Sequence, residues 1–415
     1  MKRFAAIACG FLLIGSFAAP GLRSGEARGK EPDIRVLLGE GREEVVITAD
    51  KGFSVQTPAG VLLLEVPGHG TARVSARSPS INVVVEPGNI VATADGAAAI
   101  VPARNATLTH EGVPYAGVIK IALDGGGLSV LNVLPLETYL EGVLPHEMGN
   151  PGAEGYDALK SQAVAARTYA VGKMRERRDG TFDVYASVQD QVYNGLEDNS
   201  RVTTAAVGDT RGRILSSGGE TAKTYYSACC GGHTSDIRLV WPDREPKDYL
   251  HGVRDRTRSE RGAFCRNYKY FRWRYSFTGR EMGEVLRVTL PRQLGVAADD
   301  VGALRDMRVE KRSDSGRVIT LAIETTKNTF TVEGDAIRWV LMADVDKGRI
   351  LPSVLFRLDK AMERDRIALV SVAGGGNGHG VGMCQNGAIA MARKGYTYQM
   401  ILSHYYPGCT VEKMY

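Results

Sequence analysis

The first part of the chain alternates short apolar runs with turn residues, which is the pattern of β-strands joined by hairpins. Between residues 33 and 111 the runs end at Gly, Pro, Asn or Asp, and they include IRVLLG, EEVVITADKG, VLLLEVPGHG and INVVVEPGN. Short apolar runs bounded by such residues predict strands rather than helices. We therefore predict a β-rich N-terminal region over 33–111, and we find no cluster of catalytic residue types in it.

The pattern changes to a helical period after Pro135. Helical spacing runs from Leu136 to Leu144, where Pro145 is expected to end the helix, and a longer alanine-rich helix is predicted over 153–177. Strands return after residue 180, a β-rich segment follows over 280–356, and a glycine loop at 374–382 precedes predicted helices at 385–393 and 398–405. The predicted fold class is α+β: the β-rich N-terminal region is followed by an α+β domain over 112–415, with 280–356 as a β-rich segment inside it.

The N-terminus has the pattern of an export signal. Lys2 and Arg3 precede an uncharged apolar run from Phe4 to Ala19, and a helix of that length spans about 24 Å, less than the ~30 Å hydrocarbon core of a membrane. We predict a cleaved signal peptide over 1–19 and a linker over 20–32, so that the protein is exported from a bacterium to the periplasm, cell envelope or exterior. The alternative is a retained N-terminal segment, which would be the protein's only link to a membrane.

Composition excludes several classes of protein. The 415 residues are 43% hydrophobic and 24% charged, which excludes a disordered chain and a membrane-embedded body. The formal net charge of +5 falls when Lys2 and Arg3 are removed with the signal, and no nucleic-acid-reading module accompanies it. We therefore predict no nucleic-acid partner.

Cysteines outside the apolar N-terminal run suggest a covalent or metal cross-link. They are Cys229, Cys230, Cys265, Cys384 and Cys409. In an oxidising compartment we expect a disulfide between Cys265 and either Cys229 or Cys230. The alternative is a structural zinc site made of Cys230, His233 and Cys265, with Cys229 as a further ligand, although the spacing is not that of a regular zinc motif.

Common catalytic motifs are missing from the sequence. His146-Glu147 begins like HExxH, but Asn150 stands where the second histidine is required. The glycine loop at 374–382 matches neither a P-loop nor a dinucleotide-binding fingerprint, and no GxSxG motif is present. A Cys384–His379 dyad would depend on geometry that a sequence does not show.

The chain resembles the SpoIID/LytB family, which comprises stage II sporulation protein D and the amidase enhancers. The resemblance rests on several motifs that are separated along the chain and follow one another in the family's order. The resemblance covers about Gly112 to the C-terminus. The motifs are LPLETYLEGVLPHEM at 134–148, ALKSQAVAARTYA at 158–170, QVYNG at 191–195, SACCGGHT at 227–234, YFRWR at 270–274, GHGVGMCQNGA at 378–388 and HYYPG at 404–408.

The resemblance implies a peptidoglycan-directed protein. One branch of the family consists of lytic transglycosylases, which cleave between N-acetylmuramic acid and N-acetylglucosamine and leave a 1,6-anhydro product. By motif, the family's catalytic acid falls on Glu147. Such an enzyme needs one carboxyl group, whereas most glycosidases need two. The other branch implies the alternative function: a non-catalytic wall-binding protein that enhances an N-acetylmuramoyl-L-alanine amidase.

The same resemblance implies further site residues and departures. Substrate-binding candidates are Arg167, Tyr169, Tyr193, His379 and Gln385. For Arg167 the alternative is a structural ion pair. Glu137 and Glu141 are interpreted as surface or capping charges. The partners expected are peptidoglycan glycan strands and a cell-wall amidase, and no catalytic cofactor is expected. Cys384 stands where the family commonly has serine, and Cys409 stands where it commonly has threonine. We therefore hypothesise that Cys384 pairs with Cys409.

Overall fold

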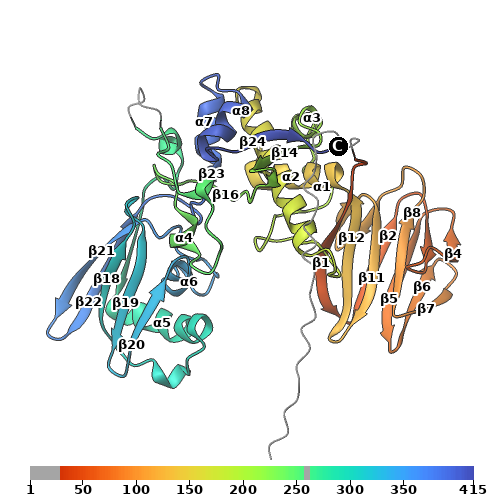
Figure 1. Cartoon of the computed structure of the whole chain (residues 1–415). Coiled ribbons are helices and arrows are strands. Elements are labelled where there is room, and N and C mark those ends of the chain that lie inside the picture. Colours follow the sequence, from red (N-terminus) through yellow and green to blue (C-terminus); the bar gives the residue numbers. More distant parts are fainter. Residues whose placement is uncertain (1–28, 257–261) are drawn as a thin grey trace, which may run out of the picture.

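The computed structural model describes residues 29–256 and 262–415, and in them the chain forms two β-rich bodies on either side of a helical centre (Figure 1). The predicted α+β class is confirmed. The predicted signal peptide lies outside the described residues, as do residues 20–28 of the predicted linker. Within the described part of the chain, no helix is both long and apolar enough to span a membrane.

Two sheets build the N-terminal body. In spatial order, the seven-stranded sheet contains β13 (Val184–Tyr185), β1 (Asp33–Arg42), β12 (Gly127–Pro135), β11 (Val118–Asp124), β8 (Ala97–Pro102), β3 (Phe53–Gln56) and β4 (Leu62–Val66). The six-stranded sheet contains β10 (Val113–Tyr115), β9 (Leu108–His110), β2 (Glu44–Ala49), β5 (Gly70–Arg77), β6 (Ser80–Glu86) and β7 (Ile90–Asp95). Alternate residues of each strand point into the core, as Ile81, Val83 and Val85 do on β6.

The boundary predicted between residues 111 and 112 runs through this body. Strand β1 pairs with β12, and β8 pairs with β11, all in the seven-stranded sheet. The core of the body also continues without a break from Ile34 to Tyr139 and Leu159 on the central helices. The structure therefore differs from a separate 33–111 region, because alternation within a strand reveals its buried face but not its partner strand.

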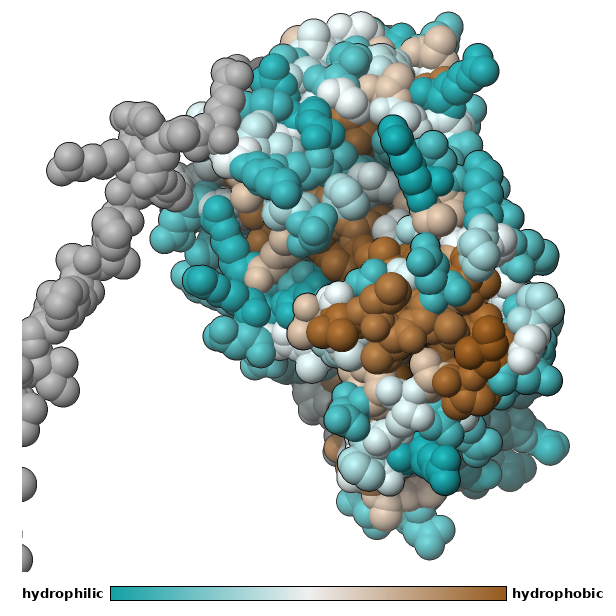
Figure 2. Space-filling view, turned by 90° about the vertical axis from the view of Figure 1, so that its right-hand side faces the viewer, coloured by the Kyte–Doolittle hydropathy of each residue, from teal (hydrophilic) through white to brown (hydrophobic). Residues whose placement is uncertain are grey.

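An apolar patch covers the end of the N-terminal body that is farthest along the sheet from β1 (Figure 2). Its large exposed side chains are Val61 and Leu62 beside or in β4, and Ile90 and Val91 in β7. The two strands contact each other, so the four side chains form one surface. This surface is remote from the helical centre.

Helix α2 (Tyr156–Glu176) is the axis of the helical centre. Around it lie α1 (Leu136–Met148), α3 (Arg201–Asp209), α7 (Gln385–Ala392) and α8 (Tyr398–Tyr405). Ala163, Ala166 and Ala170 are fully buried on α2, and their small side chains let the neighbouring elements approach closely. Beside the helices lie a sheet of β15 (Glu220–Thr221), β14 (Arg213–Ser217) and β24 (Thr410–Lys413), and a parallel pair of β16 (Tyr226–Ser227) with β23 (Met383–Cys384).

The second β-rich body is formed by residues from 273 to 374. One sheet contains β17 (Trp273–Thr278), β22 (Arg366–Gly374) and β21 (Phe356–Glu363), and another contains β18 (Leu304–Arg312), β19 (Val318–Thr325) and β20 (Thr329–Glu333). Helices α5 (Gly279–Leu294) and α6 (Ala336–Val340) complete it. The segment 280–356 therefore starts with a helix, which Thr278 and Glu281 begin with a capping box. The remaining short elements are α4 (Ile237–Val240) and 3₁₀ turns at Ala153–Gly155, Asp248–Leu250, Phe264–Asn267 and Ala298–Asp300.

Helix α1 continues past Pro145 to Met148, so the prediction that Pro145 ends it is wrong. Proline removes one backbone donor, but the residues after it can keep helical dihedral angles near a helix end. The backbone N–H of Gly149 closes the last turn on the Pro145 carbonyl at 2.9 Å. As a consequence, Glu147 lies on the last turn of a helix and not in a loop.

The interpretation of Glu137 as a surface or capping charge is also wrong, as is the substrate-binding role predicted for Arg167. The alternative for Arg167, a structural ion pair, is what the structure has. Arg167 is fully buried on α2, and its Nη2 and Nε lie 2.6 Å and 3.0 Å from the two carboxylate oxygens of Glu137 on α1. Glu137 also accepts hydrogen bonds from the Gly212 backbone and the Tyr415 hydroxyl. A helical pattern identifies a face of α2, but it does not show that an acidic residue on α1 lies opposite.

The predicted linker also takes part in this contact region. The Glu31 carboxylate accepts a hydrogen bond from the Glu137 backbone N–H at 2.9 Å and forms an ion pair with Arg211. The last residues of the segment predicted as a linker are therefore held against the start of α1.

We predict that Arg167→Met destabilises the protein by about 3–5 kcal/mol, because it leaves the Glu137 carboxylate buried without its partner. Urea unfolding followed by circular dichroism measures the change in the free energy of unfolding. Burial alone would raise the pKa of Glu137, but Arg167, Tyr415 and Gly212 hold it below its ordinary value. The stabilisation is therefore present at neutral pH, and it is lost as the pH falls toward that lowered pKa.

The matched control is Glu141→Gln, one turn further along α1. Glu141 is half-buried and has no ion pair within the described residues, and its pKa is raised by burial and by nearby carboxylates. Its substitution should change the free energy of unfolding by no more than about 0.5 kcal/mol. An equal loss of stability in both variants would contradict the special role of the Glu137–Arg167 pair.

Candidate active site

Glu147 lies where three segments of the chain meet. It is on the last turn of α1, and its Oε1 accepts a hydrogen bond from the Val192 backbone N–H at 3.1 Å. Its Oε2 faces the side-chain amide of Gln385, the first residue of α7, at 3.5 Å. The carboxyl group is thus fixed by contacts to the loop that precedes α3 and to the first residue of α7.

The surroundings of Glu147 favour its protonated form. Burial raises the pKa of Glu147, and the hydrogen bonds from Val192 and Gln385 only partly oppose that rise. The C-terminal end of a helix carries partial negative charge, which also disfavours a carboxylate there. A raised pKa is what a carboxylic acid needs if it is to donate a proton near neutral pH.

Gln385 links Glu147 to the central helix. Its Nε2 lies 3.5 Å from the Gln162 side-chain oxygen on α2, as well as 3.5 Å from Glu147. Gln162 is fully buried, and its own amide nitrogen has no hydrogen-bond partner among the residues described. The amides of Gln162 and Gln385 therefore form a buried polar set beside the carboxyl group, in which one donor is free for a ligand or a water molecule.

A small cavity of about 110 Å³ has largely aromatic walls. Tyr225, Tyr226, Trp241 and His379 line it, and Arg244 covers Trp241 with its guanidinium 4.3 Å from the ring centroid. The Trp241 ring lies 5.0 Å from that of Tyr225 and 4.8 Å from that of His379. Flat aromatic faces with a polar rim are suited to the apolar faces and hydroxyl groups of a sugar ring.

Tyr226 connects the cavity with the carboxyl group. It lines the cavity. The pKa of its hydroxyl is raised mainly by burial and, as the next cause, by the nearby charge of Glu147. The Tyr226 hydroxyl accepts a hydrogen bond from the Gln191 side chain at 2.8 Å. Gln191 directly precedes Val192, whose backbone N–H donates to Glu147. The cavity and Glu147 are therefore neighbouring parts of one site.

His379 belongs to the cavity wall. Its Nδ1 accepts a hydrogen bond from the Val381 backbone N–H at 3.1 Å, and burial lowers the pKa of His379 to about 4. The imidazole is therefore neutral at neutral pH. Gly380 has a φ of +81°, and a Cβ there would lie 2.3 Å from the Arg317 side chain, so this loop needs glycine for a close approach.

Tyr169 lies at the edge of the same cavity. Its hydroxyl donates to Asp190 at 2.7 Å, and Arg177 forms an ion pair with Asp190 at 2.8 Å. Burial and the charge of Asp190 raise the pKa of the Tyr169 hydroxyl. The ring is thus held in place with part of its surface still toward the cavity.

Tyr193 is a core residue in this structure, which differs from the substrate-binding role predicted for it. Its side chain is buried, its hydroxyl donates to Asn132 at 2.7 Å, and its ring lies 5.0 Å from that of Tyr139. A Cβ on Gly142 would lie 2.7 Å from the Tyr193 ring, so the core is closely fitted around it. Of the predicted substrate-binding residues, Gln385, His379 and Tyr169 lie around the site, whereas Tyr193 and Arg167 do not.

Sequence reasoning did not single out Gln162, Tyr226, Trp241 or Arg244. Tryptophan is scarce, since the chain has 3, and the Tyr225–Tyr226 pair directly precedes the motif at 227–234. Those two facts are a weak signal for a ligand-facing aromatic cluster. The pairing of β16 with β23, which joins Tyr226 to the glycine-loop segment, leaves no trace in the local sequence.

The cysteines differ from the predicted disulfides. All of Cys229, Cys230, Cys265, Cys384 and Cys409 have free thiols, and the Sγ atoms of Cys230 and Cys265 are 3.8 Å apart. A disulfide requires about 2.05 Å. His233, predicted as a zinc ligand, instead places its Nδ1 2.7 Å from the Thr234 carbonyl oxygen.

Comparisons with known proteins agree with this architecture. A family model described as stage II sporulation protein matches residues 124–216, and a model described as a domain of unknown function (DUF8618) matches residues 252–382. The first covers α1 and α2, and the second covers the second β-rich body and its approach from Gly252.

Relatives extend the similarity over most of the chain. An uncharacterized protein of Brachyspira hyodysenteriae is 32% identical over 309 residues, which are 73% of each chain. Stage II sporulation protein D of Bacillus subtilis is 28% identical over 300 residues, 69% of this chain and 76% of its own. The amidase enhancer of Bacillus subtilis is 28% identical over 292 residues, 66% of this chain but 40% of its own. The chain belongs to the SpoIID/LytB family.

We predict that the pKa of Glu147, followed by carboxyl-carbon NMR in the folded protein, lies above the ordinary glutamate value of about 4.3. The Gln385→Met variant should raise it further, because it removes a hydrogen bond that favours the carboxylate. Asn386 is the next residue of the same helix but donates to the Ala228 carbonyl, so Asn386→Ala is the matched control. A lower pKa in Gln385→Met would contradict this description of the site.

Proposed function

We propose that the protein is a peptidoglycan lytic transglycosylase that cleaves the bond between N-acetylmuramic acid and N-acetylglucosamine. The observation that carries the proposal is the position of Glu147: a partly buried carboxyl group with a raised pKa, beside an aromatic cavity. Family membership supports it, since relatives are named stage II sporulation protein D.

One carboxyl group is enough for this reaction. Protonated Glu147 donates its proton to the glycosidic oxygen as the bond from C1 of the muramic acid breaks. The resulting carboxylate then accepts the proton of the C6 hydroxyl, whose oxygen forms the new bond to C1 and closes the 1,6-anhydro ring. Glu147 ends the cycle protonated, and no water is consumed.

The surroundings of Glu147 support a mechanism with one carboxyl group over hydrolysis with two. The carboxylate that lines the aromatic cavity, Asp190, is already engaged by the Tyr169 hydroxyl, the Arg177 guanidinium and the Tyr185 backbone N–H. Hydrolytic glycosidases place a second carboxylate about 5–9.5 Å away as nucleophile or base. In this proposal the neutral amides of Gln385 and Gln162 border the carboxyl group and leave its pKa high.

The proposal places the protein in the cell envelope, with glycan strands as its substrate. The predicted export signal supports that location. No cofactor takes part in the proposed glycan cleavage, since proton transfer by Glu147 and attack by the substrate's own hydroxyl complete it.

A second candidate function is enhancement of an N-acetylmuramoyl-L-alanine amidase. The relative that is named an amidase enhancer favours it, although this chain matches 40% of that protein. In this function the aromatic cavity would bind glycan without cleaving it, and a cell-wall amidase would be the partner.

We predict that Glu147→Gln abolishes glycan cleavage without unfolding the protein, because the amide cannot transfer a proton at neutral pH. The control is Glu141→Gln on the same helix, which should keep the wild-type rate. Mass spectrometry of the products from denuded and from intact peptidoglycan measures the 1,6-anhydro ends.

Undiminished anhydro products from Glu147→Gln would overturn the transglycosylase proposal. Amidase stimulation that survives in this variant, with no anhydro products from the wild type, would establish the second function in its place.

We predict that Trp241→Ala weakens glycan binding by about tenfold, which corresponds to about 1.4 kcal/mol, because it removes the largest aromatic face of the cavity. The matched control is Trp339→Ala on α6, in the second β-rich body, where the side chain is exposed and does not line the cavity. Binding of denuded glycan strands to the inactive Glu147→Gln background measures the effect. Equal binding by the two tryptophan variants would exclude this cavity as the glycan site.

A further inference from the structure

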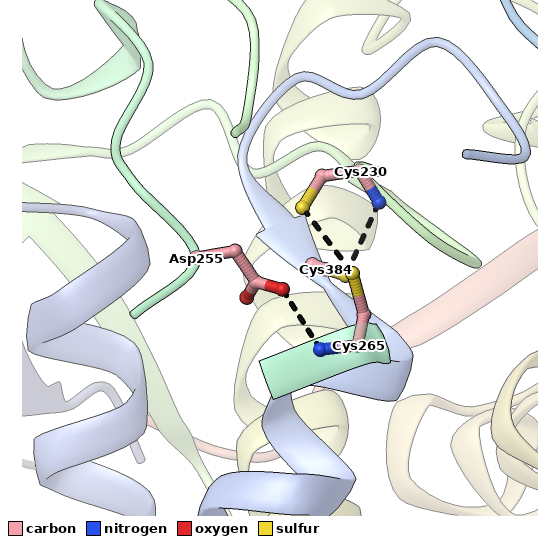
Figure 3. Close-up of side chains that lie close together, drawn as sticks. All are labelled: Cys230, Asp255, Cys265 and Cys384. Atoms are coloured by element: carbon pink, nitrogen blue, oxygen red, sulfur yellow. Dashed lines mark hydrogen bonds between the residues drawn. The ribbon is translucent and has the colours of Figure 1, made fainter. Parts of the chain in front are cut away.

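Three thiols and one carboxyl group form a buried cluster (Figure 3). Cys230 follows β16, Asp255 and Cys265 precede β17, and Cys384 is the residue directly before α7. Their ligand atoms all lie within 4.8 Å of one another, and none of the four residues is more than 1% exposed. Segments that are far apart in the sequence thus place the four groups around one point.

The spacing of the sulfur atoms fits a metal site. Two thiolates at the zinc–sulfur distance of about 2.3 Å in a tetrahedron lie about 3.8 Å apart. The Cys230 and Cys265 Sγ atoms are separated by 3.8 Å. Thiolates are soft ligands that select zinc among the common divalent ions, and a carboxylate oxygen is an accepted fourth ligand.

Backbone and side-chain donors already orient these groups. Tyr405 donates its hydroxyl hydrogen to Asp255 Oδ1 at 2.6 Å, and the Cys265 backbone N–H donates to Oδ2 at 2.9 Å. The Cys384 and Cys230 sulfurs accept backbone N–H groups, from Cys230 at 3.3 Å and from Gly232 at 3.4 Å. Outer hydrogen bonds of this kind hold metal ligands in position and stabilise thiolates.

A buried arginine supplies an independent reason for negative charge here. Arg317 is 2% exposed, and its Nη2 donates to the Cys230 carbonyl at 2.8 Å. Its Nε and Nη1 have no hydrogen-bond partner among the described residues. A buried cation of this kind requires nearby negative charge. A zinc ion bound by three thiolates and one carboxylate forms a complex whose net charge is negative, and it would meet that requirement.

We propose that Cys230, Cys265, Cys384 and Asp255 bind one Zn²⁺ ion in a closed structural site. Four protein ligands leave no open position for a substrate, so the ion would act as a cross-link. It would join Cys230, Asp255 and Cys265 to Cys384, which is covalently attached to Gln385 beside Glu147. The site is independent of the glycan chemistry proposed above.

Cys229 and Cys409 are not members of the proposed ligand set. Cys229 directly precedes Cys230 in the sequence, but it is not one of the four groups that share a common centre. Cys409 is outside the cluster. Substitution of either one therefore provides a control with the same change of side chain.

The test is the metal content of the full-length chain, produced with zinc in the medium and measured by mass spectrometry. We expect about one zinc per chain and a lower unfolding temperature after chelation. In denaturant with chelator we expect six free thiols, or five where the segment that contains Cys9 has been removed. Cys265→Ser, Cys384→Ser and Asp255→Asn should lose the metal, whereas Cys229→Ser and Cys409→Ser should keep it. If the first group does not fold, Co²⁺ added to the chelated wild type should give the absorption bands of tetrahedral thiolate coordination.

If no zinc is bound and fewer free thiols are counted than the chain has cysteines, the proposal is overturned in favour of a disulfide. Retention of zinc in Asp255→Asn with its loss in Cys229→Ser would overturn the assigned ligand set. Because metal content is measured without any glycan, these outcomes are separate from success or failure of the Glu147 experiment.

Discussion

The ion pair between Arg167 and Glu137 is the interaction on which the arrangement of the helical centre depends. It joins α2 to α1 in the interior, and the remaining donors and acceptors of the pair connect to Val207, to the start of β14 and to the C-terminal Tyr415. Two charges in a dry interior must be matched by fixed partners. These partners fix the position of α1, and therefore of Glu147 at its end, relative to α2.

The chemistry of the site follows from that placement. Because α1 extends beyond Pro145, Glu147 is held at a helix C-terminus and partly buried, and both conditions favour its neutral form. The amide groups beside it come from α2 and α7, and the aromatic wall comes from segments near β16 and α4. A reactive carboxyl group on rigid elements with neutral neighbours is well suited to transfer a proton in both directions.

The sequence predicted helices at 153–177, 385–393 and 398–405, and the structure has α2, α7 and α8 at those places, because long periodic segments carry their own signal. It did not predict the continuation of α1 past Pro145, the sheet shared across residue 111, or Glu137 as the buried partner of Arg167. Each of these depends on partners that are distant in the sequence. Arg167 and Tyr193 have the residue types of a binding site, but the interior of this protein uses them for packing and charge pairing.

The sequence by itself determined the α+β class, the family and the position of the carboxyl group proposed for catalysis, since local periodicity and ordered motifs are properties of the chain. Only the tertiary structure decided which polar groups surround Glu147, and that Asp255 and Cys384, in place of His233, lie beside Cys230 and Cys265. The physical reason is that pKa values, ion pairs and metal sites depend on distances of a few ångströms. Those distances are set by the packing of segments far apart in the sequence, such as β16 against β23.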